Sequence, residues 1–140
     1  MDERIVAYGH HAVKATHQST LEVTTDDYLT AAGDCIVGIE ADRAPVSFAP
    51  VFITACQSAT ATIRASLVVG ELETTITGRG DPAMTFESER GAVIRTSDYV
   101  DDRTVLVGAD HAAADVHRDL VERLQQGESL TLTLSVDARP

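Results

Sequence analysis

Apolar and polar residues alternate along several stretches of the chain, most clearly over residues 12–24 and 129–136. Alternation with a period of two places one set of side chains on a core and the other in water, which is the pattern of a half-buried antiparallel strand. In the first stretch this puts His17 on the apolar face, near Leu21. Residues 35–39 are apolar almost throughout and predict a central strand buried on both faces. Further short strands are predicted at 4–8, 61–69, 72–77, 83–87, 92–96 and 103–107.

One stretch, residues 111–126, has the three-to-four-residue periodicity of an amphipathic helix instead. Asp110 before it is a suitable N-cap, and Gly127 suits the position after the last turn. Residues 51–58 fit either a short helix or an irregular segment. Many short strands with one helix near the end therefore predict a mainly β fold.

The fold class expected is an antiparallel β-sandwich or a jelly-roll-like barrel, with the helix of the C-terminal region covering one opening or face. An α+β fold is the alternative. At 140 residues and 44% hydrophobic, residues 1–140 suit a single domain with one core. We expect no internal repeat, low-complexity tract or interdomain linker.

The net charge of the chain indicates the environment in which the protein works. The chain has 22 Asp and Glu against 11 Lys and Arg, a net charge of -11, and Lys14 is the only lysine. Such a chain repels itself at low salt, whereas at 1 M salt the Debye length falls to about 3 Å. The composition resembles that of cytoplasmic proteins from extreme halophiles; a moderately acidic mesophilic protein is the alternative. Nucleic acid is disfavoured as a partner because phosphate binding needs clustered Lys or Arg.

The location expected is the cytoplasm. No apolar run approaches the roughly 20 residues that cross a bilayer, so no membrane partner is expected. The N-terminal sequence MDERIVAYGHH lacks the apolar region of a signal peptide. The two cysteines, Cys35 and Cys56, match no CxxC pattern and are expected to be free thiols.

A first candidate site includes His10, His17, Asp34 and Cys35. Imidazole, carboxylate and thiolate groups are the usual ligands of zinc and iron. The separation of His10 from His17 puts them on opposite faces of a regular strand, so they converge only if Gly9 begins a turn or bulge. The other interpretation is a core-facing His17 hydrogen-bonded to backbone beside an inert Cys35.

Nucleophilic catalysis by Cys35 is a further interpretation, with His17 as base and Asp34 or Glu22 as the orienting group. Burial on a strand would raise the pKa of this thiol and block access to it. The candidate pocket therefore consists of His10, His17, Glu22, Asp34 and Cys35, with His10, His17 and Asp34 as its metal ligands.

A candidate anion site includes Arg79, Arg95 and Arg103, since guanidinium forks suit carboxylate and phosphate. Ion pairs with the surrounding Asp and Glu are the alternative. GRGDP lacks the lysine and the glycine spacing of a P-loop, and the spacing of His111 and His117 does not favour a metal pair. Hydroxyl donors near these arginines are Thr96, Ser97 and Thr104.

Five segments of the chain resemble a small archaeal family, domain of unknown function 371: GHHAVKATHQSTLEVT, LTAAGDCIVGI, GRGDP, IRTSDYVDDRT and ADHAAADV. The resemblance covers nearly the whole length. It implies a jelly-roll-like, mainly β domain, and it favours a shared polar site that includes His10, His17 and Asp34. The family pattern has histidines at or near the positions of Asp81 and Ser88 and a lysine at Thr96. The matching positions here are His10, His17, Asp34, Cys35, Arg95, Ser97 and Arg103.

Three functions are compatible with these residues. The first is a cytoplasmic archaeal binding or accessory module whose polar pocket contains His10, His17 and Asp34, with Arg95 and Arg103 nearby. The second is a metal-dependent hydrolase-like enzyme that binds a divalent metal through His10, His17 and Asp34 or Asp81, with Glu22 as base. The third is self-association or protein binding through an exposed sheet edge or the helix.

Overall fold

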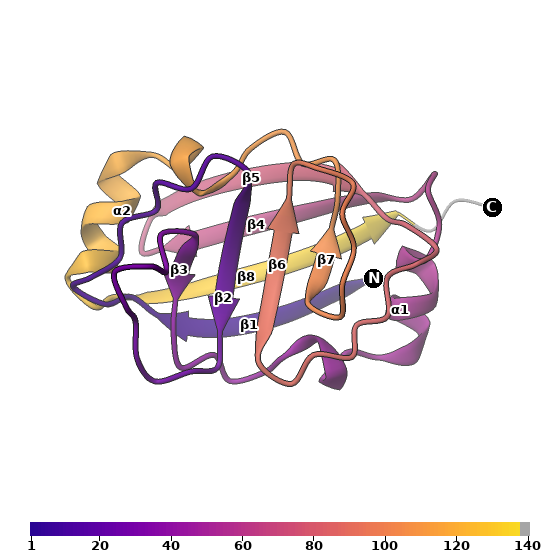
Figure 1. The fold of residues 1–140 in the computed structure, drawn as a ribbon, viewed down its shortest axis with the longest axis horizontal. Coiled ribbons are helices and arrows are strands. Elements are labelled where there is room, and N and C mark those ends of the chain that lie inside the picture. The colour runs from indigo at the N-terminus through magenta and orange to yellow at the C-terminus, as the bar shows by residue number, and fades with distance from the viewer. Residues whose placement is uncertain (138–140) are drawn as a thin grey trace.

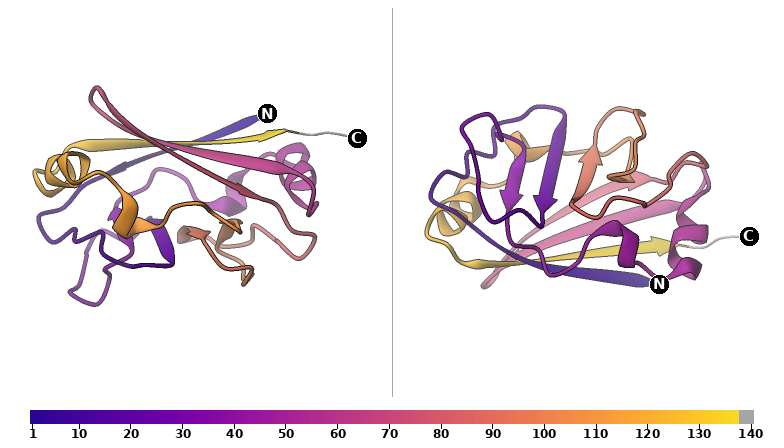
Figure 2. Two further views of the ribbon diagram at one scale, coloured as in Figure 1. Left: turned by 90° about the horizontal axis from the view of Figure 1, so that it is seen from above. Right: turned by 60° about the horizontal axis from the view of Figure 1, so that its bottom comes forward.

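The computed structural model describes residues 1–137 as two four-stranded sheets that face each other, with a short helix at each end (Figures 1 and 2). Neither helix in this range is long and apolar enough to span a membrane. The first sheet has the order β1 (Asp2–Tyr8), β8 (Ser129–Asp137), β4 (Thr62–Val69), β5 (Leu72–Arg79). The second has the order β3 (Ile36–Gly38), β2 (Thr20–Thr24), β6 (Gly91–Arg95), β7 (Thr104–Leu106). The helices are α1 (Pro50–Cys56) and α2 (Arg118–Gln125), preceded by 3-10 turns η1 (Pro45–Ser47) and η2 (Ala113–Asp115).

The core lies between the sheets and is filled by the alternating apolar residues of the strands. In β8, every second side chain from Leu130 to Val136 is buried, and the serines and threonines between them are not. This is the two-residue period on which the strand prediction depended. Strands at 4–8, 61–69, 72–77, 92–96, 103–107 and 129–136 are confirmed with small changes of boundary.

The mainly β fold class is confirmed, but the pairing is not purely antiparallel. β2 pairs with β3 in parallel, and β6 pairs with β7 in parallel. The strand predicted at 35–39 is an edge strand of its sheet rather than a central one. Single bridges, Tyr8 to Ile39 and Arg79 to Val107, connect the two sheets at their edges. A jelly roll or a closed barrel is not confirmed.

The two halves of the chain repeat one succession of elements, so the expectation of no internal repeat is wrong. The order β1–β2–β3–η1–α1–β4 is followed, after a hairpin turn at Gly70, by β5–β6–β7–η2–α2–β8. The arrangement is close to twofold: β4 pairs with β8 in the middle of the first sheet, and β2 with β6 in the middle of the second. The N-terminus lies where a matching hairpin would join β8 to β1, since the Val136 amide donates to the Met1 carbonyl.

Corresponding contacts recur in both halves. Asp42 accepts a hydrogen bond from the Val6 amide, and its counterpart Asp110 accepts one from the Thr77 amide, both at 2.9 Å. Two further pairs of counterparts share a positive φ: Ala15 with Phe86, and Glu40 with Gly108. The side chains of the counterparts Gln57 and Gln125 donate to the carbonyls of Met84 and Val13, respectively.

The halves are intertwined rather than side by side. Gly9, which follows β1, lies against the last turn of α2 so closely that a Cβ would stand 1.9 Å from the Leu124 carbonyl oxygen. Its counterpart Gly80, which follows β5, lies in the same way on α1, with a Cβ 2.0 Å from the Cys56 oxygen. Glycine is required at both positions because no side chain fits between the two backbones.

Two predicted strands, 12–24 in its first part and 83–87, are wrong. The segments before β2 and β6 bury alternate residues, Val13 and Ala15 in one and Met84 and Phe86 in the other, without pairing as strands. Ala15 and Phe86 have φ values of 50° and 55°, which redirect the chain and prevent continued strand pairing.

The helix predicted at 111–126 begins only at Arg118. His117 is in an extended conformation, with φ -56° and ψ 134°, and separates the η2 turn from α2. The predicted N-cap, Asp110, bonds instead to β5, and His117 caps α2 by accepting from the Asp119 amide. Gly127 has the expected positive φ of 86°. The segment at 51–58, where a short helix is one of the two predictions, contains most of the helix α1, which ends at Cys56.

Candidate functional site

His10 and His17 both act as hydrogen-bond acceptors in turns. The Nδ1 atom of His10 accepts from the Ala12 amide at 3.0 Å. The Nδ1 atom of His17 accepts from the amides of Ser19 and Thr20 at 3.2 and 3.1 Å. Both imidazoles therefore hold the irregular segment that leads from β1 to β2.

The second half shows that this role does not require histidine. Asp81, the counterpart of His10, accepts from the Ala83 amide at 2.9 Å. Ser88, the counterpart of His17, accepts from the amides of Arg90 and Gly91, both at 3.1 Å. Turns of this kind are made by any side chain with an acceptor two or three bonds from the backbone. The two histidines thus have a local structural role that their counterparts share.

The segments that carry His17 and Asp34 do lie side by side. The Asp34 carbonyl oxygen accepts from the Thr16 amide at 3.0 Å and from the His17 amide at 3.3 Å. Among residues 1–137, however, no three His, Cys, Asp or Glu side chains are grouped so that they could hold a metal ion. The contact between the segments is made by backbone, and the side chains of His10, His17 and Asp34 are not brought together.

Cys35 contacts Glu22 rather than His17. Its Sγ atom lies 3.7 Å from Glu22 Oε1, in hydrogen-bonding geometry. Burial raises the pKa of the Cys35 thiol, and the charge of Glu22 raises it further. A thiol with a raised pKa stays protonated at neutral pH, which is the reverse of what an activated nucleophile needs.

Two of the predicted arginines join one carboxylate. Arg95 donates to Thr104 Oγ1 at 2.9 Å and to Asp101 at 3.0 Å, and its guanidinium lies 4.8 Å from the centre of the Tyr99 ring. Arg103 donates to the same Asp101 at 3.2 Å. Burial pulls the pKa of Asp101 up, but the hydrogen bonds from Arg103 and the charge of Arg95 outweigh it and lower the pKa.

The remaining anion-site predictions lie apart from this network. Arg79 pairs with Asp81 at 3.6 Å and donates to the Gly80 carbonyl. Ser97 Oγ accepts from the Tyr99 amide at 3.3 Å within its own turn. The predicted set of arginines is therefore brought together only in part.

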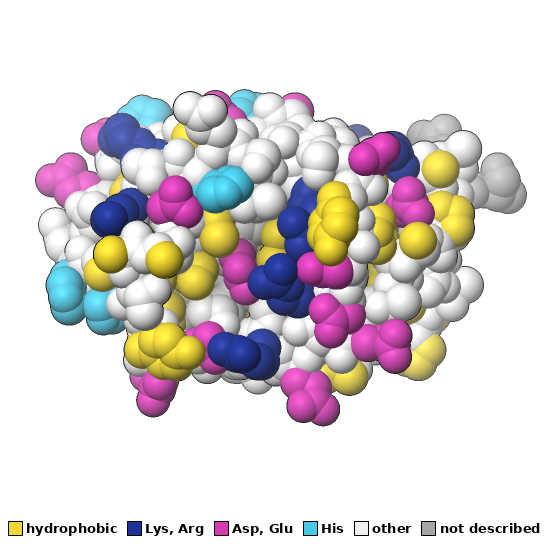
Figure 3. Space-filling view, in the orientation of Figure 1, with side chains coloured by type: hydrophobic (Ala, Val, Ile, Leu, Met, Phe, Trp, Pro, Cys, Tyr) yellow, Lys and Arg dark blue, Asp and Glu magenta, His cyan; other side chains and the backbone are white. Residues whose placement is uncertain are grey.

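The outer face of the second sheet carries a hollow of about 360 Å³. Figure 3 shows arginine side chains at the centre of this face, with acidic and hydrophobic side chains around them. Glu22 projects from β2, and Arg103 approaches it from the segment before β7, with Nη1 3.7 Å from Oε1. We call this feature the sheet hollow; it is lined by Glu22, Thr24, Asp26, Ile36, Ser88, Arg90, Asp102 and Arg103.

Glu22 is the unusual group in the sheet hollow. Its side chain is only 13% exposed, and burial raises its pKa, although Arg103, Cys35 and Arg95 partly offset that effect. The carboxylates beside it differ: a hydrogen bond from Arg90 lowers the pKa of Asp26. A perturbed carboxyl group in a concave polar surface is a common feature of functional sites.

The repeat explains why the sheet hollow is present on one side. Its counterpart would lie between the second half of β6 and the segment before β3, where His17, Asp34 and Cys35 are. At that place the counterpart of Thr24 is the larger Arg95, and the counterpart of Ile36 is Thr104. The Arg95 side chain extends to Thr104 and donates a hydrogen bond to it, which fills the position that is open in the sheet hollow. The predicted pocket and the sheet hollow are thus twofold-related positions, and Glu22, near the axis, belongs to both.

The sequence did not predict that Glu22 and Arg103 have as neighbours the residues Asp26, Arg90, Asp101 and Asp102. No local spacing connects them, because the hollow forms only when β2 pairs with β6. The signal that could have found them is the repeat, in which Asp102 corresponds to Asp34. The Asp102 carbonyl accepts from the Ser88 amide, and the Asp34 carbonyl accepts from the amide of His17, the counterpart of Ser88.

The comparisons with known proteins agree on one family. The model of the domain of unknown function DUF371 matches residues 5–137. The chain is also 36% identical over 136 residues to the uncharacterized protein MJ0206 of Methanocaldococcus jannaschii, an alignment that covers 97% of this chain and 100% of the archaeal protein. Together with the two-sheet fold described above, these matches place the chain in the DUF371 family.

Proposed function

We propose that the protein is a binding module that holds a small polar molecule in the sheet hollow. The observation that carries this proposal is the state of Glu22. Its carboxylate is largely buried, yet among residues 1–137 only the weakly donating Cys35 thiol bonds to it, and Arg103 stays at 3.7 Å. No fully buried side-chain nitrogen or oxygen of residues 1–137 lacks a hydrogen-bond partner, so the Glu22 oxygen that the protein does not bond faces the hollow. A ligand that donates hydrogen bonds would supply what the protein does not.

The lining residues favour a ligand with both a donor and an acid group. Arg103 is 43% exposed and has guanidinium N–H groups free to meet a carboxylate. Glu22, a few ångströms away, suits an ammonium or hydroxyl group. An α-amino acid or a small α-hydroxy acid carries both of these groups. Thr24 and Ser88 provide further hydroxyl groups in the same hollow.

The proposal is tested by thermal-shift measurements with a panel of free amino acids and hydroxy acids. One or more members should raise the melting temperature of the wild type but not of Glu22→Gln or Arg103→Gln. Arg64→Gln is the matched control, because it removes an exposed ion pair with Asp137 on the other sheet. No shift with any member, or an equal shift in Glu22→Gln, would contradict the proposal.

The alternative of a metal-dependent hydrolase has no support in the part of the chain that the structure describes, where no three-ligand group is present. Its discriminating measurement is metal analysis of protein purified without chelator. A stoichiometric metal that is lost in a folded His17→Ala variant would favour the enzyme over the binding module.

The proposed working environment is an archaeal cytoplasm with high salt. The support is the net charge of -11, which makes self-repulsion large at low salt. The free energy of unfolding should increase with KCl concentration up to at least about 1 M, where the Debye length is near 3 Å. Stability that is independent of KCl would indicate the moderately acidic mesophilic alternative.

A further inference from the structure

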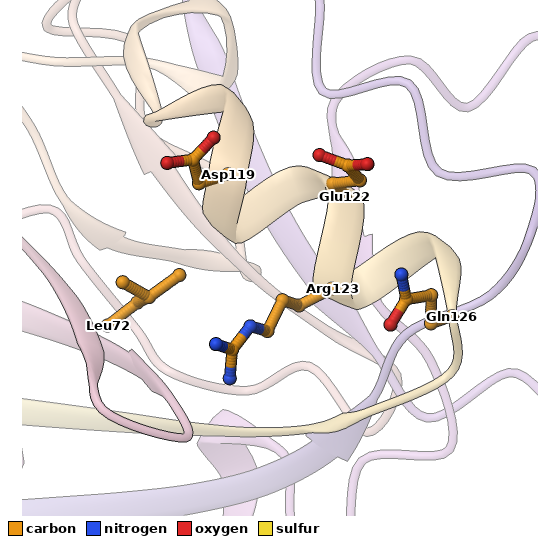
Figure 4. Close-up of a pocket in the computed structure, with 5 residues that line it drawn as sticks. All are labelled: Leu72, Asp119, Glu122, Arg123 and Gln126. Carbon is orange, nitrogen blue, oxygen red and sulfur yellow. The ribbon is translucent and has the colours of Figure 1, made fainter.

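A groove separates the start of β5 from helix α2, and it shares no lining residue with the sheet hollow. It consists of two adjoining hollows of about 310 and 270 Å³ that share Leu72 and Asp119. Figure 4 shows Leu72 on one side and the side chains of α2 on the other. Leu72 and Thr74 are only half-buried there, whereas Ile76, further along the same face of β5, is fully buried. We call this feature the β5–α2 groove.

The edge of β5 beside the groove has free backbone groups. Alternate residues of an edge strand direct their N–H and C=O groups away from the sheet. On β5 the residues that direct their backbone groups outward begin with Arg79 and Thr77. Arg79 pairs with Val107, and Thr77 exchanges hydrogen bonds with Asp110. Thr75 and Glu73 continue the series, and within residues 1–137 neither has a backbone partner on that side.

The internal repeat shows how the fold covers such an edge when it is not used. On β1 the Arg4 carbonyl, the counterpart of that of Thr75, accepts from Arg43 at 2.9 Å. Glu3 fills the space before α1 and accepts from the Ala49 amide at 2.7 Å. On β5 the counterpart of Glu3 is the short Thr74, which leaves the groove open. The groove that Thr74 leaves open beside the edge is thus a property of the second half.

We propose that the β5–α2 groove binds an extended, lysine- or arginine-rich segment of another protein, which adds to β5 as a further strand. Added strands gain main-chain hydrogen bonds, and alternate side chains enter the pockets beside the edge. The charge of the groove selects the partner. Among the described residues the only Lys or Arg in its lining is Arg123, which is paired with Glu71 and Glu128. Glu73, Asp119 and Glu122 have no Lys or Arg within 4 Å among these residues, although His117 lies 3.8 Å from Asp119. Leu72 and Leu120 provide an apolar floor for the aliphatic parts of the partner side chains.

The test uses two labelled peptides of alternating sequence, (Lys-Val)₄ and (Glu-Val)₄, at a salt concentration that keeps the protein folded. Fluorescence anisotropy should detect binding of the lysine peptide and not of the glutamate peptide. Amide chemical shifts should move at Glu73 and Thr75. Glu73→Arg should weaken binding about tenfold or more, since a like charge in an interface costs well over 1 kcal/mol. Asp2→Arg changes the corresponding residue of β1 and should leave the affinity within about twofold.

Thr75→Pro provides a second variant that depends on the backbone rather than on charge. It removes an edge N–H that has no described partner, so the protein should stay folded while the peptide no longer binds. Equal binding of both peptides, equal weakening by Asp2→Arg, or unchanged binding in folded Thr75→Pro would each overturn the proposal. A concentration-dependent dimer that Thr75→Pro abolishes, without peptide binding, would replace the basic partner with a second copy of the chain.

Discussion

Glu22 and Val93 lie directly opposite each other on β2 and β6, and each is the counterpart of the other in the internal repeat. The axis that relates the halves therefore passes between an acidic and an apolar side chain on the outer face of one sheet. The fold tolerates valine at this position, so it does not require the carboxylate. Likewise Arg103 corresponds to Cys35. The Arg103 carbonyl accepts from the Val93 amide, and the Cys35 carbonyl accepts from the Glu22 amide. These charged residues, which break the twofold arrangement, support the proposal that the sheet hollow binds a ligand.

Glu22→Gln should change how stability depends on pH. Burial raises the pKa of Glu22 in the folded protein above its ordinary value, so the folded state takes up this proton before the unfolded state does as the pH falls. The contribution of Glu22 to stability is therefore greatest in acid and is lost as the pH rises through the raised pKa. The free energy of unfolding of Glu22→Gln minus that of the wild type should increase over this range, as measured by urea denaturation at several pH values. A difference that is flat or decreases would show that the carboxyl group is not desolvated.

The histidine turns should accept the residues found at their counterparts. His17→Ala removes an acceptor for two amides and should cost about 1 kcal/mol, as the loss of a capping side chain does. His17→Ser and His10→Asp place the residues of the second half in the same turns and should cost much less. Chemical denaturation measures all three variants. Were His17→Ser as damaging as His17→Ala, the imidazole would have a role beyond the turn.

Gly9→Ala and Gly80→Ala should be severely destabilising, because the new Cβ would stand about 2 Å from a helix carbonyl oxygen in each case. We expect a loss of about 3 kcal/mol or more, at the upper end for overpacking, because backbone rather than a side chain must move. Gly33→Ala is the control, since its nearest neighbours are the ends of Leu29 and Ile36 side chains. Similar losses at Gly9 and Gly80, measured by thermal unfolding, are required by the repeat.

A circular permutant should keep the fold. The repeat places the N-terminus beside the end of β8 in the way that Leu72 lies beside Val69, where a hairpin joins β4 to β5. Joining residue 140 to Met1 through one added glycine, and opening the chain between Gly70 and Glu71, exchanges the two hairpins. The amide spectrum should match that of the wild type away from the new junctions. A collapsed spectrum in a soluble permutant would argue against equivalent halves.

Much of the first sheet could be predicted because β8 alternates apolar and polar residues without interruption, and most of β4 does the same. The same alternation at Met84 and Phe86 is misleading, since a residue with positive φ buries its side chain without continuing a strand. The length of α2 could not be predicted either, because the apolar spacing continues through Val116 although the backbone there is extended. Propensity and period are local, and both failures come from tertiary contacts.

The candidate site could be predicted only as separate pieces. Glu22 was assigned to one predicted site and Arg103 to another, and only the pairing of β2 with β6 joins them. The repeat that would have linked the pieces is hidden because few counterparts are identical. Pairs such as Gly9 and Gly80, or Asp42 and Asp110, are preserved where backbone geometry demands them, and the remaining core accepts any apolar residue of fitting size.

Binding of a small polar ligand to Glu22 and Arg103 in the sheet hollow is measured most directly by NMR titration of labelled protein with the active member of the amino-acid and hydroxy-acid panel. We expect saturable shifts of the Glu22 carboxyl carbon and of the amides of Thr24, Gly91 and Arg103, which are absent in Glu22→Gln. Saturable shifts that fall elsewhere on the molecule, or that persist unchanged in Glu22→Gln, would contradict binding at this site.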